Sequence, residues 1–216
     1  MADSNSFRIL IDIFASPGEA FTAIRERPKF VLPWLLVMLA SAGAIGLYMS
    51  EVDIGWLTEQ SLRSVRIVEL TEDQIEQMVE VAVDRGPGVA IVRGALTSMA
   101  AVTIFFLLQA LYLKVVSAIA KDGVRYRQWF GLACWTAMPA IVGSIATIVF
   151  ILTNDVSFIS QTGINPLSFS SLLGIDVADM GLMPRVLLST SPVNLWTIAL
   201  MIFGYRTSTQ KSLGSV

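Results

Sequence analysis

Four long apolar runs dominate the sequence, and polar stretches separate them. The runs extend from Val31 to Ser50, from Gly94 to Leu113, from Trp129 to Leu152 and from about Val186 to Tyr205. A bilayer core of about 30 Å takes roughly 20 apolar residues of α-helix to cross, so each run is close to the length of a span. The sequence therefore predicts an all-α fold, a polytopic helical membrane bundle with four spans.

The composition fits a chain whose main surroundings are lipid. Only 15% of the 216 residues are charged, and the mean hydropathy is +0.67. A soluble domain usually carries about 25% charged residues. Four spans with short connections predict a single membrane domain over residues 1–216, in which residues 1–30 form an arm before the first span.

The fourth run gives the weakest span signal. Ser191-Pro192 has the pattern of a helix start, and a helix from Pro192 to Tyr205 would cover only about 21 Å. Two interpretations stay open. Either Val186–Leu188 continue the helix through a proline kink, or the span is short and its end is shielded.

The residue types exclude several classes of function. Histidine is absent, which removes Ser-His-Asp and Cys-His catalysis and the commonest zinc ligands. Cys134 is the only cysteine and lies inside an apolar run, so we expect it to fill the core. The acidic residues between Glu51 and Gly88 could attract a divalent cation, but their spacing favours a solvated helix face. We therefore predict no catalytic residues, no metal and no cofactor, and the protein is not expected to be an enzyme.

The basic residues predict the orientation. Ten of them fall on one side of the four runs: Arg8, Arg25, Arg27, Lys29, Lys114, Lys121, Arg125, Arg127, Arg206 and Lys211. Five are spread over the two longer loops of the other side: Arg63, Arg66, Arg85, Arg93 and Arg185. The positive-inside tendency then places both termini in the cytoplasm, and we expect a multi-pass protein of a bacterial inner membrane.

Asp3 and Asp12 interrupt the start, so no cleavable signal peptide is expected and the first span should remain as an anchor. The net charge of −2, without a basic stripe, gives no reason to expect nucleic acid as a partner.

The N-terminal arm predicts two short amphipathic helices in the inner membrane interface. Ser16-Pro17-Gly18-Glu19 has a serine cap, a proline at the first helical position and a glutamate three residues after the cap. Upstream, Phe7, Leu10, Ile11 and Phe14 recur at helical spacing. The arm either cushions the bundle or provides a surface that docks a partner or senses lipid.

The two outer segments are expected to fold locally. Thr71-Glu72-Asp73-Gln74 resembles a capping box, and the helix that follows should end at Pro87-Gly88. The stretch from Thr153 to Arg185 is too apolar for a free linker and too broken for a span. It predicts short helices over the outer mouth of the bundle, with re-entry into the membrane as the alternative.

Small and polar residues inside the spans are candidate packing or partner contacts. Gly43 and Gly46 give the first span a small-residue face, within the protein or toward another subunit. Gln109 and Asn194 can bridge two helices, and Pro139 lies in the middle of the third run. Packing is the favoured role for these amides, and a transport path lined by them is the alternative.

Three stretches of the chain resemble the Yip family, the Rab-GTPase-interacting membrane proteins of eukaryotes and their bacterial relatives. The first is IFASPGEAFTAIRERPKFVLPWLL, which carries an F-x-x-P-x-x-x-F-x-x-I pattern through Phe14, Pro17, Phe21 and Ile24 and continues into a proline-led span. The others are YRQWFGLACWTAMPAIVG, with Pro139, and NLWTIALMIFGYRTSTQKS. The resemblance implies a helical membrane bundle with a cytoplasmic N-terminus and no catalytic residues. Relatives commonly have a fifth span, so this member is either shortened or given only in part.

The predicted function combines these features. Eukaryotic relatives act as adaptors in vesicle traffic, and the resemblance implies that some bacterial relatives assist ABC-type exporters. We predict a non-catalytic integral membrane accessory or scaffold protein that binds another membrane complex, such as an ABC-type exporter. Membrane lipids and another membrane protein are the expected partners, and a homo-oligomer is compatible with the small-residue faces. A small oligomeric transporter or channel is the alternative. The candidate contacts are Phe14, Pro17, Phe21, Gly43, Gly46, Gln109, Pro139 and Asn194.

Overall fold

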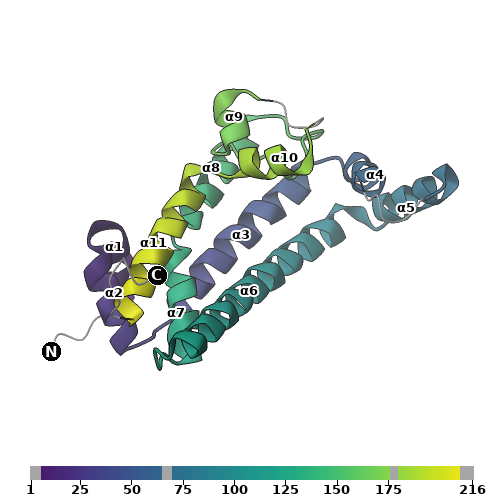
Figure 1. Cartoon of the computed structure of the whole chain (residues 1–216). Helices are drawn as coiled ribbons and strands as arrows, with labels where there is room; N and C mark the ends of the chain where they lie inside the picture. Colours follow the sequence, from purple (N-terminus) through teal and green to yellow (C-terminus); the bar gives the residue numbers. More distant parts are fainter. Residues whose placement is uncertain (1–5, 65–69, 176–179, 210–216) are drawn as a thin grey trace. The chain divides into compact units, whose positions relative to one another are not determined.

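The computed structural model describes residues 6–64, 70–175 and 180–209, and within these ranges α-helix is the only regular secondary structure (Figure 1). Eleven helices follow one another there, joined by loops. The all-α prediction is confirmed. The order of long apolar and short polar helices repeats the alternation of apolar and polar stretches in the sequence.

Among the described residues, three helical segments are long and apolar enough to cross a membrane. They are α3 (Val31–Glu51), α6 (Gly86–Ala120) and the segment Tyr126–Thr153, which contains α7 (Tyr126–Thr136) and α8 (Ala140–Thr153). The bounds of α3 are close to those predicted. Helix α6 has 35 residues, about 52 Å, and extends well beyond the predicted run at both ends. A helix can continue past its apolar run because its backbone hydrogen bonds do not depend on lipid.

The third span is a helix with a short irregular step at residues 137–139. Pro139 has no N–H to donate, and the hydrogen bonds around it join residues three apart, such as Ala140 N to Ala137 O at 2.9 Å and Val142 N to Pro139 O at 2.9 Å. The chain therefore passes Pro139 through a tightened turn, and the helix resumes at once.

The fourth predicted span is not one continuous helix. The structure has α10 (Leu182–Ser189) and α11 (Pro192–Thr209), with a break at residues 190–191. Pro192 begins α11, and the backbone N–H groups of Asn194 and Leu195 both return to Ser191 O. The described residues thus contain three candidate spans, or four if α10 and α11 are counted together.

The described residues divide into two compact units, each built from separate stretches of the chain. The first unit comprises Met1–Ala40, Ala100–Gly143 and Thr190–Val216, and the second comprises Ser41–Met99 and Ser144–Ser189. Each unit has its own apolar core. The single membrane domain expected over residues 1–216 stays a prediction.

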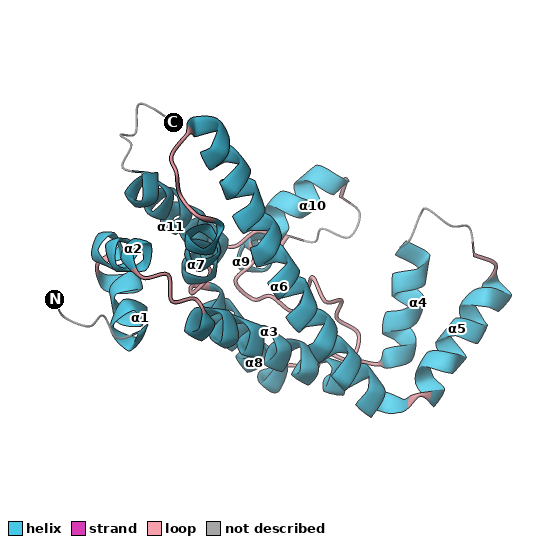
Figure 2. Ribbon diagram, turned by 90° about the horizontal axis from the view of Figure 1, so that it is seen from below, coloured by secondary structure: helices cyan, strands magenta, loops and turns pink. Residues whose placement is uncertain are grey.

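In the first unit, two short N-terminal helices pack against α7 and α11. Helix α1 (Ser6–Ala15) contacts α2 (Pro17–Glu26), and α2 contacts both α7 and α11, as Figures 1 and 2 show. The core between them is apolar and aromatic. Its most deeply buried large side chains are Ile9, Ile13, Phe21, Phe106, Trp129, Leu132, Trp135 and Met138.

In the second unit, α4 (Ile54–Ser64) and α5 (Glu72–Asp84) lie side by side (Figure 2). The predicted capping box at the start of α5 is confirmed: Gln74 N donates to Thr71 Oγ1 at 3.3 Å, and Thr71 N donates to Gln74 Oε1 at 3.0 Å. The segment after α8 is a loop that contains the five-residue helix α9 (Phe169–Leu173) and leads to α10. Short helices were predicted in this segment, and they are present.

Candidate functional site

The N-terminal arm is docked on the first unit through Phe21. This side chain is 1% exposed and lies against Gly204 of α11 and Leu132 of α7. A Cβ atom at Gly204 would stand 3.0 Å from Phe21 Cε1, and a still closer approach to Leu132 leaves no space on the other side. Glycine is therefore required at position 204 for α2, α7 and α11 to meet. We call α1, α2 and the segment that links them to α3 the N-terminal module.

Side chains of α7 hold the end of α2 and the linker between α2 and α3. Trp135 Nε1 donates a hydrogen bond to Lys29 O at 2.7 Å, and Gln128 Nε2 donates to Arg25 O at 3.0 Å. Pro28 lies beside Gly131, where an added Cβ would be 3.4 Å from Pro28 Cβ. Trp135, the donor of the first bond, is fully buried. The module is thus fixed to the bundle by polar as well as apolar contacts.

Aromatic pairs complete the docking at the ends of α7 and α11. Trp129 stacks on Tyr205, with ring centroids 5.5 Å apart, and Phe30 meets Phe130 edge-on at 5.0 Å. The guanidinium carbon of Arg127 stands 5.7 Å from the centroid of Phe30, within the range of a cation–π contact. An exposed cation of α7 is therefore attached to the linker of the module.

Helix α1 contributes the outer layer of the module. Ile9 and Ile13 are 1% and 0% exposed and face the core, while Phe14 meets Trp196 of α11 edge-on at 5.3 Å. The arm thus packs on the bundle, as one of the two sequence interpretations proposed. Its docking does not use all of its apolar side chains, because Phe7 and Ile11 remain exposed.

The predicted start of α2 is found, with one correction. Pro17 is the first residue of α2, and the backbone N–H of Glu19 returns to Ser16 O at 3.0 Å. The predicted serine cap is wrong in its detail: among the described residues, no backbone N–H donates to the Ser16 hydroxyl, whose residue has φ −146° and ψ 66°. Pro17 already leaves one fewer N–H to satisfy at this end of the helix.

Gly43 and Gly46 of α3 lie where an added Cβ atom would meet no close neighbour. Gly46 faces Ile91 of α6, whose Cγ2 would be 3.8 Å from an added Cβ, and no atom of another described element lies within 4 Å of a Cβ at Gly43. A tighter approach between the same two helices is at Gly94 of α6, where a Cβ would meet Met49 Cγ at 2.9 Å. The sequence analysis did not single out Gly94 as a contact. Its only signal was that of a small residue at the edge of an apolar run.

The two amides inside the runs have different environments. Asn194 Oδ1 accepts hydrogen bonds from Ser191 N at 3.0 Å and from Ser191 Oγ at 2.6 Å, so this amide closes the first turn of α11. Gln109 is half-buried on α6, and its side chain makes no hydrogen bond with any residue that the structure describes. The Ser191-x-x-Asn194 spacing is the sequence signal that could have predicted the capping role.

Hydroxyl groups connect α3 and α6 within each unit. In the first unit, Trp34 Nε1 donates to Thr103 Oγ1 at 3.1 Å, and in the second, the hydroxyls of Ser41 and Ser98 are 2.7 Å apart. Each pair joins the two helices through a polar contact. Bonds of this kind contribute about 0.6 kcal/mol each on average in membrane proteins.

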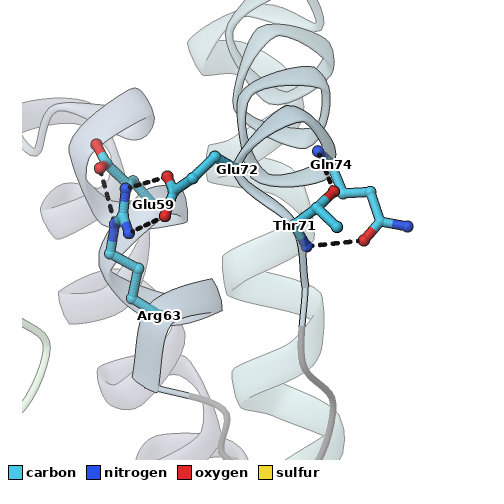
Figure 3. A network of polar contacts seen from close by, with 5 residues as sticks. All are labelled: Glu59, Arg63, Thr71, Glu72 and Gln74. Carbon is cyan, nitrogen blue, oxygen red and sulfur yellow. Dashed lines mark hydrogen bonds and ion pairs between the residues drawn. The ribbon is translucent and has the colours of Figure 1, made fainter.

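The second unit contains the exposed charges with the clearest interactions. Arg63 of α4 donates to Glu59 Oε1 at 3.0 Å and to both carboxylate oxygens of Glu72 on α5, at 3.0 and 2.8 Å (Figure 3). These bonds raise the pKa of Arg63 and lower the pKa of Glu72. In the loop after α8, the Ser157 hydroxyl and then its backbone N–H lower the pKa of Asp155. These charged side chains thus hold the contact between α4 and α5 and the start of the loop after α8.

Metal-binding geometry is not found in the part of the chain that the structure describes, where no three histidine, cysteine or carboxylate side chains cluster. The hollow of about 450 Å³ along α6 is open and apolar, and it is lined by Gly88, Val89, Val92, Arg93, Leu96 and Thr97. A surface formed by one side of a single helix does not assemble groups for chemistry. The N-terminal module is therefore the most structured candidate site in the described chain.

A bundle of long apolar helices with interhelical hydroxyl contacts and a packed N-terminal module defines a multi-pass helical membrane protein. The comparison with protein families identifies the family to which this bundle belongs. Residues 11–214 match the Yip1 domain, and the chain therefore belongs to the Yip1 family. Members of this family are generally non-catalytic membrane proteins. The comparison with curated proteins gives no match, and neither does the comparison with solved structures.

Proposed function

We propose that this Yip1-domain protein is a non-catalytic accessory or scaffold protein that binds another membrane complex, such as an ABC-type exporter. The proposal includes a bacterial inner membrane as its location and a cytoplasmic side for both termini. The basic residues at the start of the chain, around the turn between α6 and α7, and from the last turn of α11 onward support this orientation.

The observation that carries the proposal is the fixed docking of the N-terminal module. Phe21, Trp135 and Gln128 attach the module to α7 and α11 from inside, so the outer side of α2 stays available. Thr22 and Glu26 lie one turn apart on that exposed side. A surface that is held in one conformation loses little entropy when a partner binds, which suits a scaffold.

The polar residues inside the runs give less support to the alternative, a small oligomeric transporter or channel. Asn194 serves the first turn of α11, and the hydroxyls of Ser98 and Thr103 bond to α3. Of the two amides proposed to line a path, Gln109 has the less constrained side chain. Flux through proteoliposomes that disappears in Gln109→Leu would favour the transporter.

Co-purification from mild detergent tests the scaffold proposal. The affinity-tagged chain is compared with Thr22→Lys/Glu26→Lys, which changes the charge of the exposed side of α2, and with Glu76→Lys/Glu80→Lys, a matched pair on the exposed side of α5. We expect a membrane partner to accompany the unchanged chain and the α5 variant and to be lost from the α2 variant. Native mass spectrometry of the same samples separates a foreign partner from further copies of this chain. A single monomeric particle across several detergents contradicts the proposal.

A further inference from the structure

Helix α1 has two apolar sides, and only one of them is packed against protein. Ile9 and Ile13 are buried in the core of the first unit at 1% and 0% exposure. On another side of the same ten-residue helix, Phe7, Ile11 and Phe14 are 64%, 67% and 39% exposed. Their spacing of four and three residues aligns them in one stripe, which we call the outer stripe of α1. Three large apolar side chains left in water would be costly on so short a helix.

The outer stripe is continuous with an exposed apolar surface of α11. Phe14 meets Trp196 edge-on, with the rings 5.3 Å apart and nearly perpendicular at 80°. Trp196 is itself 43% exposed, and it belongs to a run of exposed apolar side chains on α11. That surface of α11 is formed by Leu195, Trp196, Ile198, Ile202 and Phe203.

The exposed surface of α11 indicates what covers the outer stripe. In a multi-pass membrane protein, exposed apolar side chains of a membrane-spanning helix face lipid, and α11 forms the fourth candidate span when it is counted together with α10. The Phe14–Trp196 contact places the C-terminal end of α1 on the same surface, so both helices meet the same surroundings there. We infer that the outer stripe of α1 is embedded among the lipid acyl chains that cover the adjoining surface of α11.

The charges on α1 are compatible with this position. Arg8 is next to Phe7, its side chain is 65% exposed, and its Nε lies 3.6 Å from the Asp12 carboxylate. A long arginine side chain can keep its charge at the level of the lipid headgroups while its methylene groups lie against apolar surface. The pairing with Asp12 reduces the net charge that this side of the helix carries. Helix α1 is thereby an anchor in the membrane interface, and this inference does not rest on the proposed function.

Spin-label accessibility in proteoliposomes tests the inference. Cysteine is introduced at Ile11 in a Cys134→Ala background, and the label is exposed in turn to oxygen, which concentrates in lipid, and to a water-soluble nickel complex. Ile198→Cys on the exposed surface of α11 provides the lipid reference, and Glu26→Cys at the end of α2 provides the aqueous reference. We expect the label at position 11 to follow position 198, with oxygen access severalfold higher relative to nickel access than at position 26.

Two results would overturn the inference. Nickel access at position 11 equal to that at position 26 would show that the stripe faces water. An immobile label with little access to either reagent would show that another protein, or a second copy of this chain, covers it. Phe7→Cys repeats the measurement one turn away, so a folding defect in one variant does not decide the outcome.

Discussion

Gly204 of α11 faces the ring of Phe21 of α2 so closely that a methyl group at position 204 would lie 3.0 Å from Phe21 Cε1. Leu132 of α7 closes the same site, and both apolar side chains are 1% exposed. Neither can move into solvent to make room. The contact joins parts of the chain that are far apart in sequence, so the position of the N-terminal module depends on a residue near the end of the last helix.

Gly204→Val is therefore expected to destabilise the protein, whereas Gly43→Val should have little effect. Overpacking a well-filled core costs about 1–3 kcal/mol. Both glycines lie inside helices, but no atom of another described element is within 4 Å of a Cβ at Gly43, so this variant controls for the change in helix propensity. Thermal stability in detergent, followed by size-exclusion chromatography of a fluorescent fusion, measures the difference. Equal melting temperatures for the two variants would contradict the packing argument.

Trp135→Phe should loosen the linker between α2 and α3. The substitution removes the hydrogen bond to Lys29 O, and one hydrogen bond of this kind contributes about 1 kcal/mol. Trypsin reports the result, because it cleaves after Lys29 and is blocked after Arg27 by Pro28. We expect faster cleavage at Lys29 in Trp135→Phe than in the unchanged chain.

Trp196→Phe is the matched control for this experiment. Trp196 is 43% exposed, and its indole makes no hydrogen bond with the described residues, while a phenylalanine can keep the edge contact with Phe14. Cleavage at Lys29 should stay at the level of the unchanged chain. If both variants are cleaved alike, the Trp135–Lys29 bond does not hold the linker.

The features that are local in sequence were the ones that sequence analysis could predict. A run of apolar residues of bilayer length determines a span without reference to any other segment, and α3 begins at Val31 as expected. The capping box of Thr71 and Gln74 depends on residues three apart, and it also forms as predicted. The same rule applied to Ser191 and Asn194 would have predicted that Asn194 closes the first turn of α11 instead of bridging two helices.

The contacts that position the N-terminal module could not be read from the sequence in the same way. Trp135 and Lys29 are 106 residues apart, and nothing in either segment specifies that one donates to the other. Gly94 and Gly204 are small residues in apolar surroundings, as are several others, and only the arrangement of the helices brings other side chains so close to these two. The break between α10 and α11 was also not predictable. The local pattern allowed either a helix that continues through a proline kink or a short span, and it did not decide between them.

Tyr48→Phe should free the loop that follows α8. The Tyr48 hydroxyl donates to Ile159 O at 2.8 Å from a side chain that is 0% exposed, and removing one hydrogen bond of this kind costs about 1 kcal/mol. This energy corresponds to a severalfold increase in local opening. Hydrogen exchange of residues 156–164 should accelerate accordingly. Tyr112→Phe, at a side chain that is 67% exposed, is the control and should leave exchange in this loop unchanged.

The contact between α4 and α5 is expected to weaken in acid. Hydrogen bonds from Arg63, and then its charge, lower the pKa of Glu72 below the ordinary glutamate value of 4.5. Because the folded-state pKa is the lower one, the pair stabilises the helix contact above pH 4.5, and this contribution is lost as the pH falls through the lowered pKa. Arg63 stays charged throughout, since its own pKa is raised.

Carbon-13 NMR of the Glu72 carboxyl group in nanodiscs measures this titration directly. In the unchanged chain, the midpoint should lie below 4.5, because the guanidinium of Arg63 favours the ionised carboxylate. Arg63→Gln removes both the charge and the two-point hydrogen bond shown in Figure 3, so the midpoint should move up toward the ordinary value. Glu59→Gln leaves those bonds in place and should keep the midpoint low. The same midpoint in Arg63→Gln and in the unchanged chain would mean that Arg63 does not hold Glu72 in solution, because an exposed pair can exchange its partners for water.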